Sequence, residues 1–570
     1  MRYSSREKFS HYVDLFVLFI ALFIFINNLF ELSYGFRPYI YRLGMILITL
    51  FGFELVVQFL LQPSPKAYIS KYWPHYIILA VLVYAYYRFS IVPRDARLFF
   101  IYSRLFLGAV EILLFIKFIL QLGRLREIIG TFKVKPAQLI VVSFASIIII
   151  GSFFLYLPYS RPAGTSMRYI DALFTSTSAV CVTGLIVVNT GAAFSRLGHG
   201  FLILLIQVGG IGIMTIAAFI QVSLGSTMSL YGRFQNATML DQTNIRNLYT
   251  IIRAIVAITF IFESIGFLLF FSYFRTTRSS GLEAAFHSLF HSISAFCNAG
   301  FSLYGESFMG ASSNVWANTV LVFLIVTGGF GFTVLLNLGR KITMGARERI
   351  TVQSRIVLLS SLFFIFFGAL GFYLFERDNI LAGAGPPERF LASVFQSVTT
   401  RTAGFNTVDT SSLKPFTLFI MSILMFIGAS PGSTGGGIKT TTFFVLLLSI
   451  VTIRREQRFN TIFKRRIPYQ VVNRSFAIAV CALGLVVMGT LLLGLSEKFD
   501  FIQVFFETVS AFGTVGLSTG ITPRLSDFGK IVIMVCMFSG RLGPLTLVIA
   551  TRNVTSTRFV TYPEERIMVG

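Results

Sequence analysis

The stretch Phe506-Glu-Thr-Val-Ser-Ala-Phe-Gly-Thr-Val-Gly516-Leu517 decides the fold. It predicts a short amphipathic helix that runs into Thr-Val-Gly, and a long hydrophobic segment lies on each side of it. A single tripeptide of this kind is weak evidence for any structure. Its value comes from three related stretches elsewhere in the chain.

The related stretches begin at Phe174, Phe290 and Phe395 and end on the glycines Gly184, Gly300 and Gly404. In three of the four stretches, Phe lies ten residues before the glycine, Ser six before it and Ala five before it. The stretch that ends at Gly404 is looser and one residue shorter. Successive glycines are 116, 104 and 112 residues apart. A long period carried by whole hydrophobic–loop–hydrophobic units predicts four copies of one membrane module.

Four such loops in one chain can line one pore. Carbonyls in a Thr-Val-Gly loop can replace the hydration shell of a potassium ion, and the backbone angles this requires are easily adopted by glycine. The alternative is glycine at helix-packing faces, since the chain has 47 glycines. Recurrence in matching contexts favours an ion filter. The predicted filter residues are Val182, Thr183, Gly184, Asn298, Ala299, Gly300, Thr402, Ala403, Gly404, Thr514, Val515 and Gly516.

The composition is that of a polytopic membrane protein, with 570 residues, 55% of them hydrophobic and 13% charged. The net charge of +24 does not indicate a nucleic-acid partner, because Lys and Arg lie in short loops between apolar runs, as the positive-inside rule predicts. The expected partner is the lipid bilayer. His287 and His291 have a zinc-like spacing, but position 288 is Ser where a catalytic site needs Glu. We therefore expect no enzyme activity, cofactor or transition-metal site.

The fold class predicted is an all-α membrane protein with four pseudo-symmetric helix–pore-loop–helix repeats around one central pore. About four additional transmembrane helices precede them, in a module spanning residues 1–130. Arg2, Arg6 and Lys8 place the N-terminus in the cytoplasm, and the C-terminus is expected there as well. The four inner helices are expected at about 199–222, 315–338, 415–450 and 528–550. The repeats span 135–225, 245–345, 352–455 and 470–552, and a cytoplasmic tail covers 553–570.

The third inner helix differs from the others. As one helix its apolar span of about 36 residues would be about 54 Å long, far beyond a hydrocarbon core of about 30 Å. Its middle, residues 428–442, holds a proline and many glycines and hydroxyls, so it cannot remain helical. Irregular backbone at membrane depth must lie against protein or water, which predicts a loop in the cavity below the filter. The gating residues expected there are Gly435, Gly436, Gly437 and Lys439.

Arg541 lies near the middle of the last inner helix. A central arginine costs about 2.5–3.5 kcal/mol on insertion scales, so it must face water or a partner. It would form a barrier to cations in the pore, or pair with carbonyls of a broken helix, or both.

Other charges lie near the pore helices. The acidic residues Asp171, Glu283, Glu388 and Glu507 either concentrate cations in a vestibule or are ordinary helix-start acids. Arg401 is a fixed positive charge three residues before Gly404, and we expect it to pair with a carboxylate behind the filter.

These residues resemble the Trk/Ktr/HKT superfamily of potassium transporters, most closely the bacterial Ktr-type membrane subunit. The resemblance covers about residues 135–570 and rests on the four filter motifs, Ala403–Asn406, the glycine-rich break and Arg541. It implies potassium as the substrate, and Gly184 implies potassium or rubidium over sodium. It also implies a homodimer, a cytoplasmic nucleotide-binding (RCK-type) regulatory subunit and a bacterial inner-membrane location. The N-terminal module is a departure from the shorter members.

Two other functions remain as alternatives. A voltage-gated channel would use the N-terminal helices as its sensor, but Arg97 and Arg104 lack the regular three-residue spacing of such helices. A secondary transporter for an organic solute would have inverted repeats, whereas these are parallel. Passive flux and coupling to sodium or protons stay open.

Overall fold

The computed structural model describes residues 136–212 and 248–551, apart from residues 163, 279, 348, 457 and 458, together with six isolated positions between 49 and 84. The chain divides into two compact units, Met1–Val134 and Lys135–Gly570. All helices discussed below belong to the second unit. The predicted N-terminal module, apart from the six positions, and the predicted tail lie outside the described residues.

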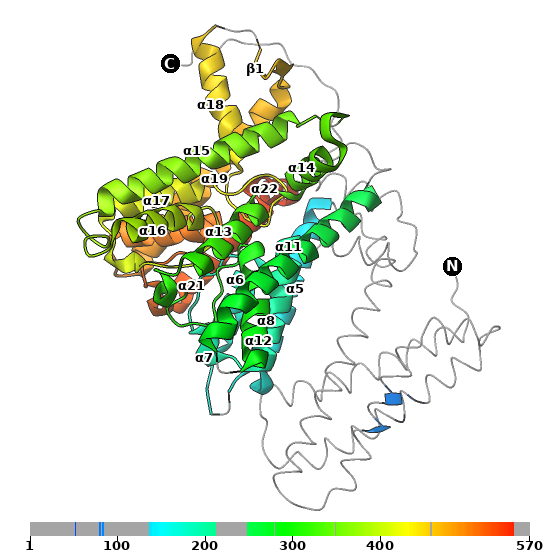
Figure 1. Cartoon of the computed structure of the whole chain (residues 1–570), viewed down its shortest axis with the longest axis vertical. Helices are drawn as coiled ribbons and strands as arrows, with labels where there is room; N and C mark the ends of the chain where they lie inside the picture. Colours follow the sequence, from blue (N-terminus) through cyan, green and yellow to red (C-terminus); the bar gives the residue numbers. More distant parts are fainter. Residues whose placement is uncertain are drawn as a thin grey trace, which may run out of the picture. The chain divides into compact units, whose positions relative to one another are not determined.

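The second unit is built from helices in four successive groups (Figure 1). Each group has a first helix, a short pore helix and an inner helix, in that order, and we call each group a pore unit. The members are α5 (Pro136–Tyr156), α6 (Tyr169–Val180) and α8 (Arg196–Ile211); α11 (Leu248–Thr277), α12 (Gly281–Phe296) and α13 (Val315–Gly329); α15 (Val352–Glu376), α16 (Pro386–Thr399) and α17 (Pro415–Phe426); and α19 (Tyr469–Ser496), α20 (Phe501–Gly513) and α21 (Asp527–Leu542).

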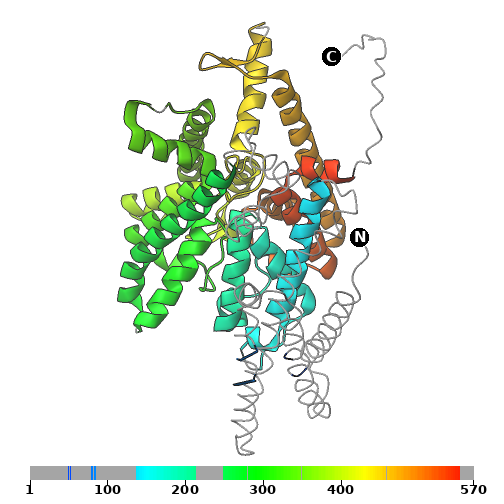
Figure 2. The ribbon, with the colours of Figure 1, turned by 90° about the vertical axis from the view of Figure 1, so that its right-hand side faces the viewer.

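Further elements lie between or after these helices. They are α7 (Thr190–Ala193), α14 (Phe332–Met344), α18 (Thr440–Arg454), α22 (Pro544–Thr551), and the antiparallel strands β1 (Thr461–Ile462) and β2 (Arg465–Arg466). Single 3₁₀ turns lie at Pro158–Ser160, Met309–Ala311, Gly345–Arg347, Thr410–Ser412 and Thr522–Arg524. Figure 2 shows α18 and α19 side by side, in yellow and orange, with the two strands at their tip.

Local signals start the inner helices at matching places. Ser195, Asn314 and Ser526 are N-caps, and each side chain accepts a hydrogen bond from the backbone N–H three residues later. The inner helix of the third unit, α17, begins instead with Pro415 at its first position, where a missing N–H costs nothing. The start of each inner helix is therefore determined by residues next to it in the chain.

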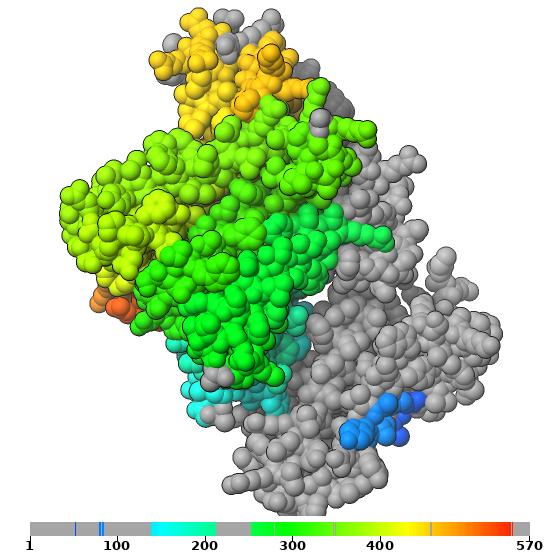
Figure 3. All heavy atoms as spheres, viewed as in Figure 1, coloured from blue at the N-terminus to red at the C-terminus, as the bar shows by residue number. Residues whose placement is uncertain are grey.

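Three described helices are long and apolar enough to cross a membrane: α11 over Ile252–Thr277, α15 and α19. Only 33%, 33% and 28% of their most apolar windows are buried within the chain, so most of each helix surface needs an apolar solvent. The exposed side chains of α15 include Leu362, Phe366 and Phe367. Figure 3 shows the broad surface that α15 and α11 form in light and mid green. The predicted all-helical membrane fold class is confirmed.

The inner helices differ from the continuous spans expected at 315–338 and 528–550. In the second unit the helix ends at Gly329, and α14 continues after Gly331 (φ +88°) with a bend of 102°. In the fourth unit α21 ends at Leu542, before Gly543 (φ +84°) and Pro544. Those expectations were wrong, because a glycine with positive φ ends the helix inside each apolar run.

The first and third inner helices also end before the ends of the spans expected for them. In the first unit α8 ends at Ile211 before Gly212 (φ +86°), and residues 213–222 of the expected span lie outside the described residues. In the third unit α17 ends at Phe426 and α18 begins at Thr440, with irregular backbone between them.

Candidate ion pathway

The four repeated glycines face one another in a closed ring. A Cβ built on each glycine would meet the carbonyl oxygen of the residue before the glycine of another unit. For Gly184 the distance is 2.5 Å, and for Gly300 it is 2.8 Å. The contacts run from Gly184 to Ala299, from Gly300 to Ala403, from Gly404 to Val515 and from Gly516 to Thr183. Because the fourth contact returns to the first unit, we call these residues the glycine ring.

The backbone repeats the same unusual conformation in all four loops. The residue two before each glycine has positive φ, at 56°, 58°, 68° and 50° for Val182, Asn298, Thr402 and Thr514. The glycines have φ values of 87°, 69°, 76° and 93°. A left-handed non-glycine residue costs about 1–2 kcal/mol, and such strain persists only where surrounding structure holds it. Four equal loops therefore present equivalent backbone groups around one axis.

Hydroxyl groups of the pore helices hold this backbone. Ser178 Oγ accepts from the N–H of Gly184 at 3.0 Å, and Ser510 Oγ accepts from Gly516 at 3.1 Å. In the second unit Ser294 Oγ donates to the carbonyl of Phe301 at 2.8 Å. These are the serines six residues before the glycines, so the repeated Ser has a physical explanation.

In the third loop, which is one residue shorter, the supporting hydroxyl belongs to the residue five positions before the glycine instead of six. Thr399, five residues before Gly404, donates from its Oγ1 to the carbonyl of Phe405 at 2.7 Å. The backbone N–H of Ala403 donates to the carbonyl of Thr399 at 3.0 Å. The missing residue in the third copy therefore shifts the supporting hydroxyl by one position.

The glycine-rich segment, residues 428–439, lies against the first residues of two filter loops. The N–H of Gly436 donates to Thr514 Oγ1 at 2.9 Å. A Cβ on Gly435 would collide with Thr402 Oγ1, so only glycine lets the backbone of the segment come this close to the Thr402 side chain. Lys439 Nζ donates to the carbonyl of Gly435 at 2.6 Å and closes a turn within the segment.

Arg541 joins the last inner helix to two other units. Its guanidinium donates to the carbonyl of Thr434, in the glycine-rich segment, and to the carbonyl of Gly209, near the end of α8. Thr434 Oγ1 in turn lies 3.2 Å from the carbonyl of Gly328, near the end of α13. The side chain thus pairs with carbonyls near broken helix ends, one of the two interactions expected for it.

Comparison with known proteins identifies the family. The model of the TrkH family, described as cation transport proteins, matches residues 130–562. The chain belongs to the TrkH family. It is 37% identical to the Ktr system potassium uptake protein B of Bacillus subtilis over 446 residues, covering 78% of this chain and 99% of that protein. The corresponding protein of Vibrio alginolyticus is 38% identical over 435 residues, covering 76% and 94%.

The fold is also that of a solved TrkH structure. The crystal structure of the potassium transporter TrkH from Vibrio parahaemolyticus matches with a TM-score of 0.58 and 18% identity, covering 91% of this chain and 98% of that one. Because the chain belongs to the TrkH family and its relatives are potassium uptake proteins, it is a multi-pass membrane transport protein and not an enzyme.

In this TrkH-family chain the acidic residues near the pore helices have protein partners. Asp171 pairs with Lys530 Nζ at 2.7 Å in a nearly buried contact, and Glu283 pairs with Arg196 at 3.3 Å. Glu388 accepts from the N–H of Gly385 at the start of its own helix. These contacts favour structural roles over a free vestibule charge.

Glu507 is fully buried and holds the chain that follows the fourth filter loop. Its carboxylate accepts from Ser518 Oγ, from the N–H of Thr519 at 3.2 Å and from Thr522 Oγ1 at 3.0 Å. In the second unit His291 occupies the same position, with its Nε2 3.3 Å from Ser302 Oγ. In these two units the residue after the repeated Phe therefore ties a pore helix to the segment beyond its filter.

The expected pairing of Arg401 is wrong. Its side chain is 8% exposed, and no carboxylate of the described residues forms an ion pair with it. Its Nε has no hydrogen-bond partner within the described part of the chain. Arg401 follows the C-terminal end of α16, where the negative end of the helix dipole favours a cation.

Sequence analysis missed a second set of glycines. Gly209, Gly328 and Gly540 pack so closely that an added Cβ would collide with the carbonyl of the residue four before a ring glycine. Each is followed three residues later by the glycine that ends its helix. The repeated Gly-x-x-Gly in three inner helices was a usable signal, since it recurs in step with the filter motifs.

Proposed function

We propose that this chain carries potassium across the membrane through the glycine ring. The observation that carries the proposal is the closed ring itself, since four equivalent loops direct equivalent backbone groups at one axis. Carbonyls of the three filter residues in each loop would replace the water around a dehydrated potassium ion. The two Ktr relatives carry potassium uptake in their names, which supports the same ion.

The glycine-rich segment and Arg541 form the gate in this proposal. The segment contacts Thr402 and Thr514, which begin two filter loops, so an ion leaving the ring on that side meets it first. Arg541 bonds the segment to the first unit, and its positive charge opposes a cation. Opening requires the guanidinium to release at least one carbonyl, with Lys439 and Gly435 to Gly437 moving with the segment.

The remaining proposals concern assembly and location. We propose that the chain forms a homodimer with one pore in each protomer. We also propose that it binds a cytoplasmic nucleotide-binding subunit, because the Ktr relatives are named as parts of a system. The protein would lie in a bacterial inner membrane with both termini in the cytoplasm. The pore units would follow the predicted boundaries, with 1–130 as an added module.

Reconstitution in liposomes tests the function. Purified full-length protein is assayed for flux of potassium, rubidium, sodium and lithium, with empty liposomes as the control. Potassium and rubidium flux well above sodium and lithium is expected. Equal flux of all four cations would contradict a selective ring. If none of the four cations shows flux above empty liposomes, the assay is repeated with Arg541→Gln. Absence of flux in that variant as well would contradict the proposal.

A further inference from the structure

Two pore-helix residues lack the contact described for His291 and Glu507. The residue after the buried Phe of each pore helix is polar and at most 1% exposed. In the first unit it is Thr175, whose Oγ1 donates to the carbonyl of Asp171 at 2.8 Å. In the third unit it is Gln396, and neither its Oε1 nor its Nε2 has a hydrogen-bond partner among the described residues.

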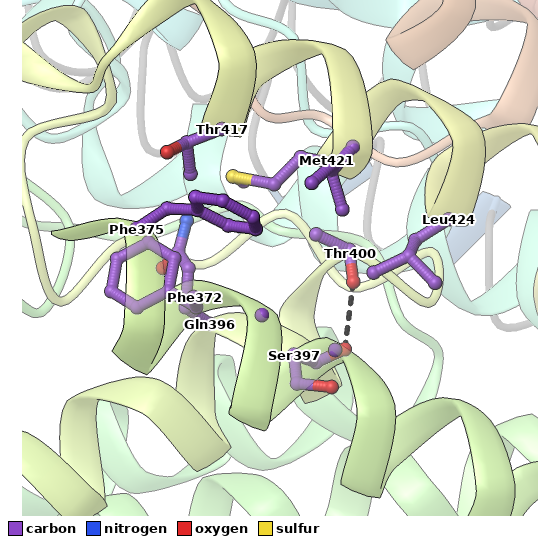
Figure 4. Close-up of a pocket in the computed structure, with 11 residues that line it drawn as sticks. Phe372, Phe375, Gln396, Ser397, Thr400, Thr417, Met421 and Leu424 are labelled. Carbon is purple, nitrogen blue, oxygen red and sulfur yellow. Dashed lines mark hydrogen bonds between the residues drawn. The ribbon is translucent and has the colours of Figure 1, made fainter.

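Gln396 lines a small pocket inside the third pore unit, between α15, α16 and α17 (Figure 4). Phe372 of α15 and Met421 of α17 form apolar walls, and Thr417 of α17 adds a hydroxyl. The space open to the centre of a water-sized sphere is about 10 Å³. A volume of about 10–15 Å³ on this measure holds one water molecule. The pocket therefore has room for one water molecule.

The polar groups around this space match one water. Buried polar groups are almost always hydrogen-bonded, and a buried water typically makes about three bonds. The Gln396 amide offers a donor and an acceptor. Thr417 Oγ1 donates its only proton to Glu376 Oε1, so its oxygen remains free to accept. Thr400 Oγ1 likewise donates to the carbonyl of Ser397 at 2.7 Å, the dashed line in Figure 4.

We propose that one ordered water occupies this pocket, accepting from Gln396 Nε2 and donating to Gln396 Oε1 and Thr417 Oγ1. Glu376 also accepts from the N–H of Lys414 at 3.0 Å, at the start of α17. The water thus completes a chain of hydrogen bonds from the pore helix α16 to the entry of α17. The pore helix α16 leads into the third filter loop, and α17 leads into the glycine-rich segment. The water takes the place of the protein contacts made by His291 and Glu507.

A density map of the full-length protein in lipid nanodiscs, at a resolution that shows ordered waters, tests the proposal directly. The expected result is one compact peak within hydrogen-bonding distance of the Gln396 amide and Thr417 Oγ1. An empty pocket, or elongated density from a lipid chain, would overturn it. This readout needs no ion flux, so it stands apart from the transport proposal.

The variant Gln396→Met gives a second test. It keeps the length of the side chain and removes its hydrogen bonds, so the water should be lost and the midpoint of thermal unfolding should fall. The matched control is Met421→Leu, an apolar change in the same pocket, which should keep the water peak. If Gln396 has no partner at all, its removal relieves an unpaired amide and the midpoint rises, which contradicts the proposal.

Discussion

Replacing Gly184 by serine tests whether the glycine ring sets ion selectivity. Gly184 has φ +87°, and a Cβ there would lie 2.5 Å from the carbonyl oxygen of Ala299 and 3.0 Å from the Cα of Gly300. The positive φ costs a non-glycine residue about 1–2 kcal/mol. Overpacking of a filled site costs about 1–3 kcal/mol more, and moving the neighbouring loop is the direct way to relieve it.

A moved loop widens the ring and weakens carbonyl contacts that a potassium ion needs. Since 1.4 kcal/mol corresponds to a factor of ten, we expect Gly184→Ser to reduce discrimination of potassium over sodium by about 10- to 100-fold. The matched control is Gly520→Ser, because Gly520 has φ +86° but, apart from its two chain neighbours, no described residue has an atom within 4 Å of its added Cβ. The control carries the backbone cost without the crowding.

The assay is flux into liposomes under matched potassium and sodium gradients, with protein amount checked for each variant. The control is expected to keep the selectivity of the parent protein. Equal selectivity in Gly184→Ser and Gly520→Ser would refute the reasoning, because crowding inside the ring would then have no effect on the ion.

Three further variants test the charged residues. Arg541→Gln removes the guanidinium that bonds two carbonyls, so potassium flux should rise several-fold. The control Arg524→Gln, in an exposed turn, should leave potassium flux unaltered. Unchanged flux in both variants would contradict the proposed gate. Lys530→Met removes the nearer of two cations beside Asp171 and leaves only the exposed Arg168, at 3.4 Å. The free energy of unfolding, measured by denaturation in detergent, should fall by at most about 3–5 kcal/mol. Arg401→Met replaces a buried cation that has no carboxylate partner among the described residues. The free energy of unfolding should rise by about 1–4 kcal/mol. A fall in that free energy would show that α16 depends on the charge.

The filter could be predicted because its requirements are local. Glycine is needed where φ is positive and a neighbouring carbonyl approaches, and serine is needed to hold the loop from six residues away. Both requirements appear as fixed spacings in three of the four units, and the third unit keeps the glycine with a spacing one residue shorter. The residues of the ring can therefore be picked out from the amino-acid sequence alone, although their function as a filter remains a proposal.

The breaks in the inner helices could not be predicted from hydropathy. Around Gly331 and Gly543 the apolar run continues, so length and composition favour one span. Each helix ends at a single glycine with positive φ, and a second glycine three residues earlier packs closely against another part of the chain. Neither the positive φ nor the close packing can be read from the hydropathy of the apolar run. The same holds for Arg401, because the absence of a carboxylate beside it, within the described residues, depends on how separate units pack.

The third pore unit differs from the other three in its pore loop, its supporting hydroxyl and its inner helix, and it contains the proposed gate. Its pore loop is one residue shorter, and its supporting hydroxyl is Thr399 where the other units use serine. Its inner helix leads into a long irregular segment, and that segment contacts the filter loops. Gln396 lacks the protein contact that stiffens the second and fourth units. A ring needs four equal loops to coordinate an ion, but a gate needs only one unit to move. The unit whose pore helix holds an unpaired buried amide, among the described residues, is the one that leads into the proposed gate.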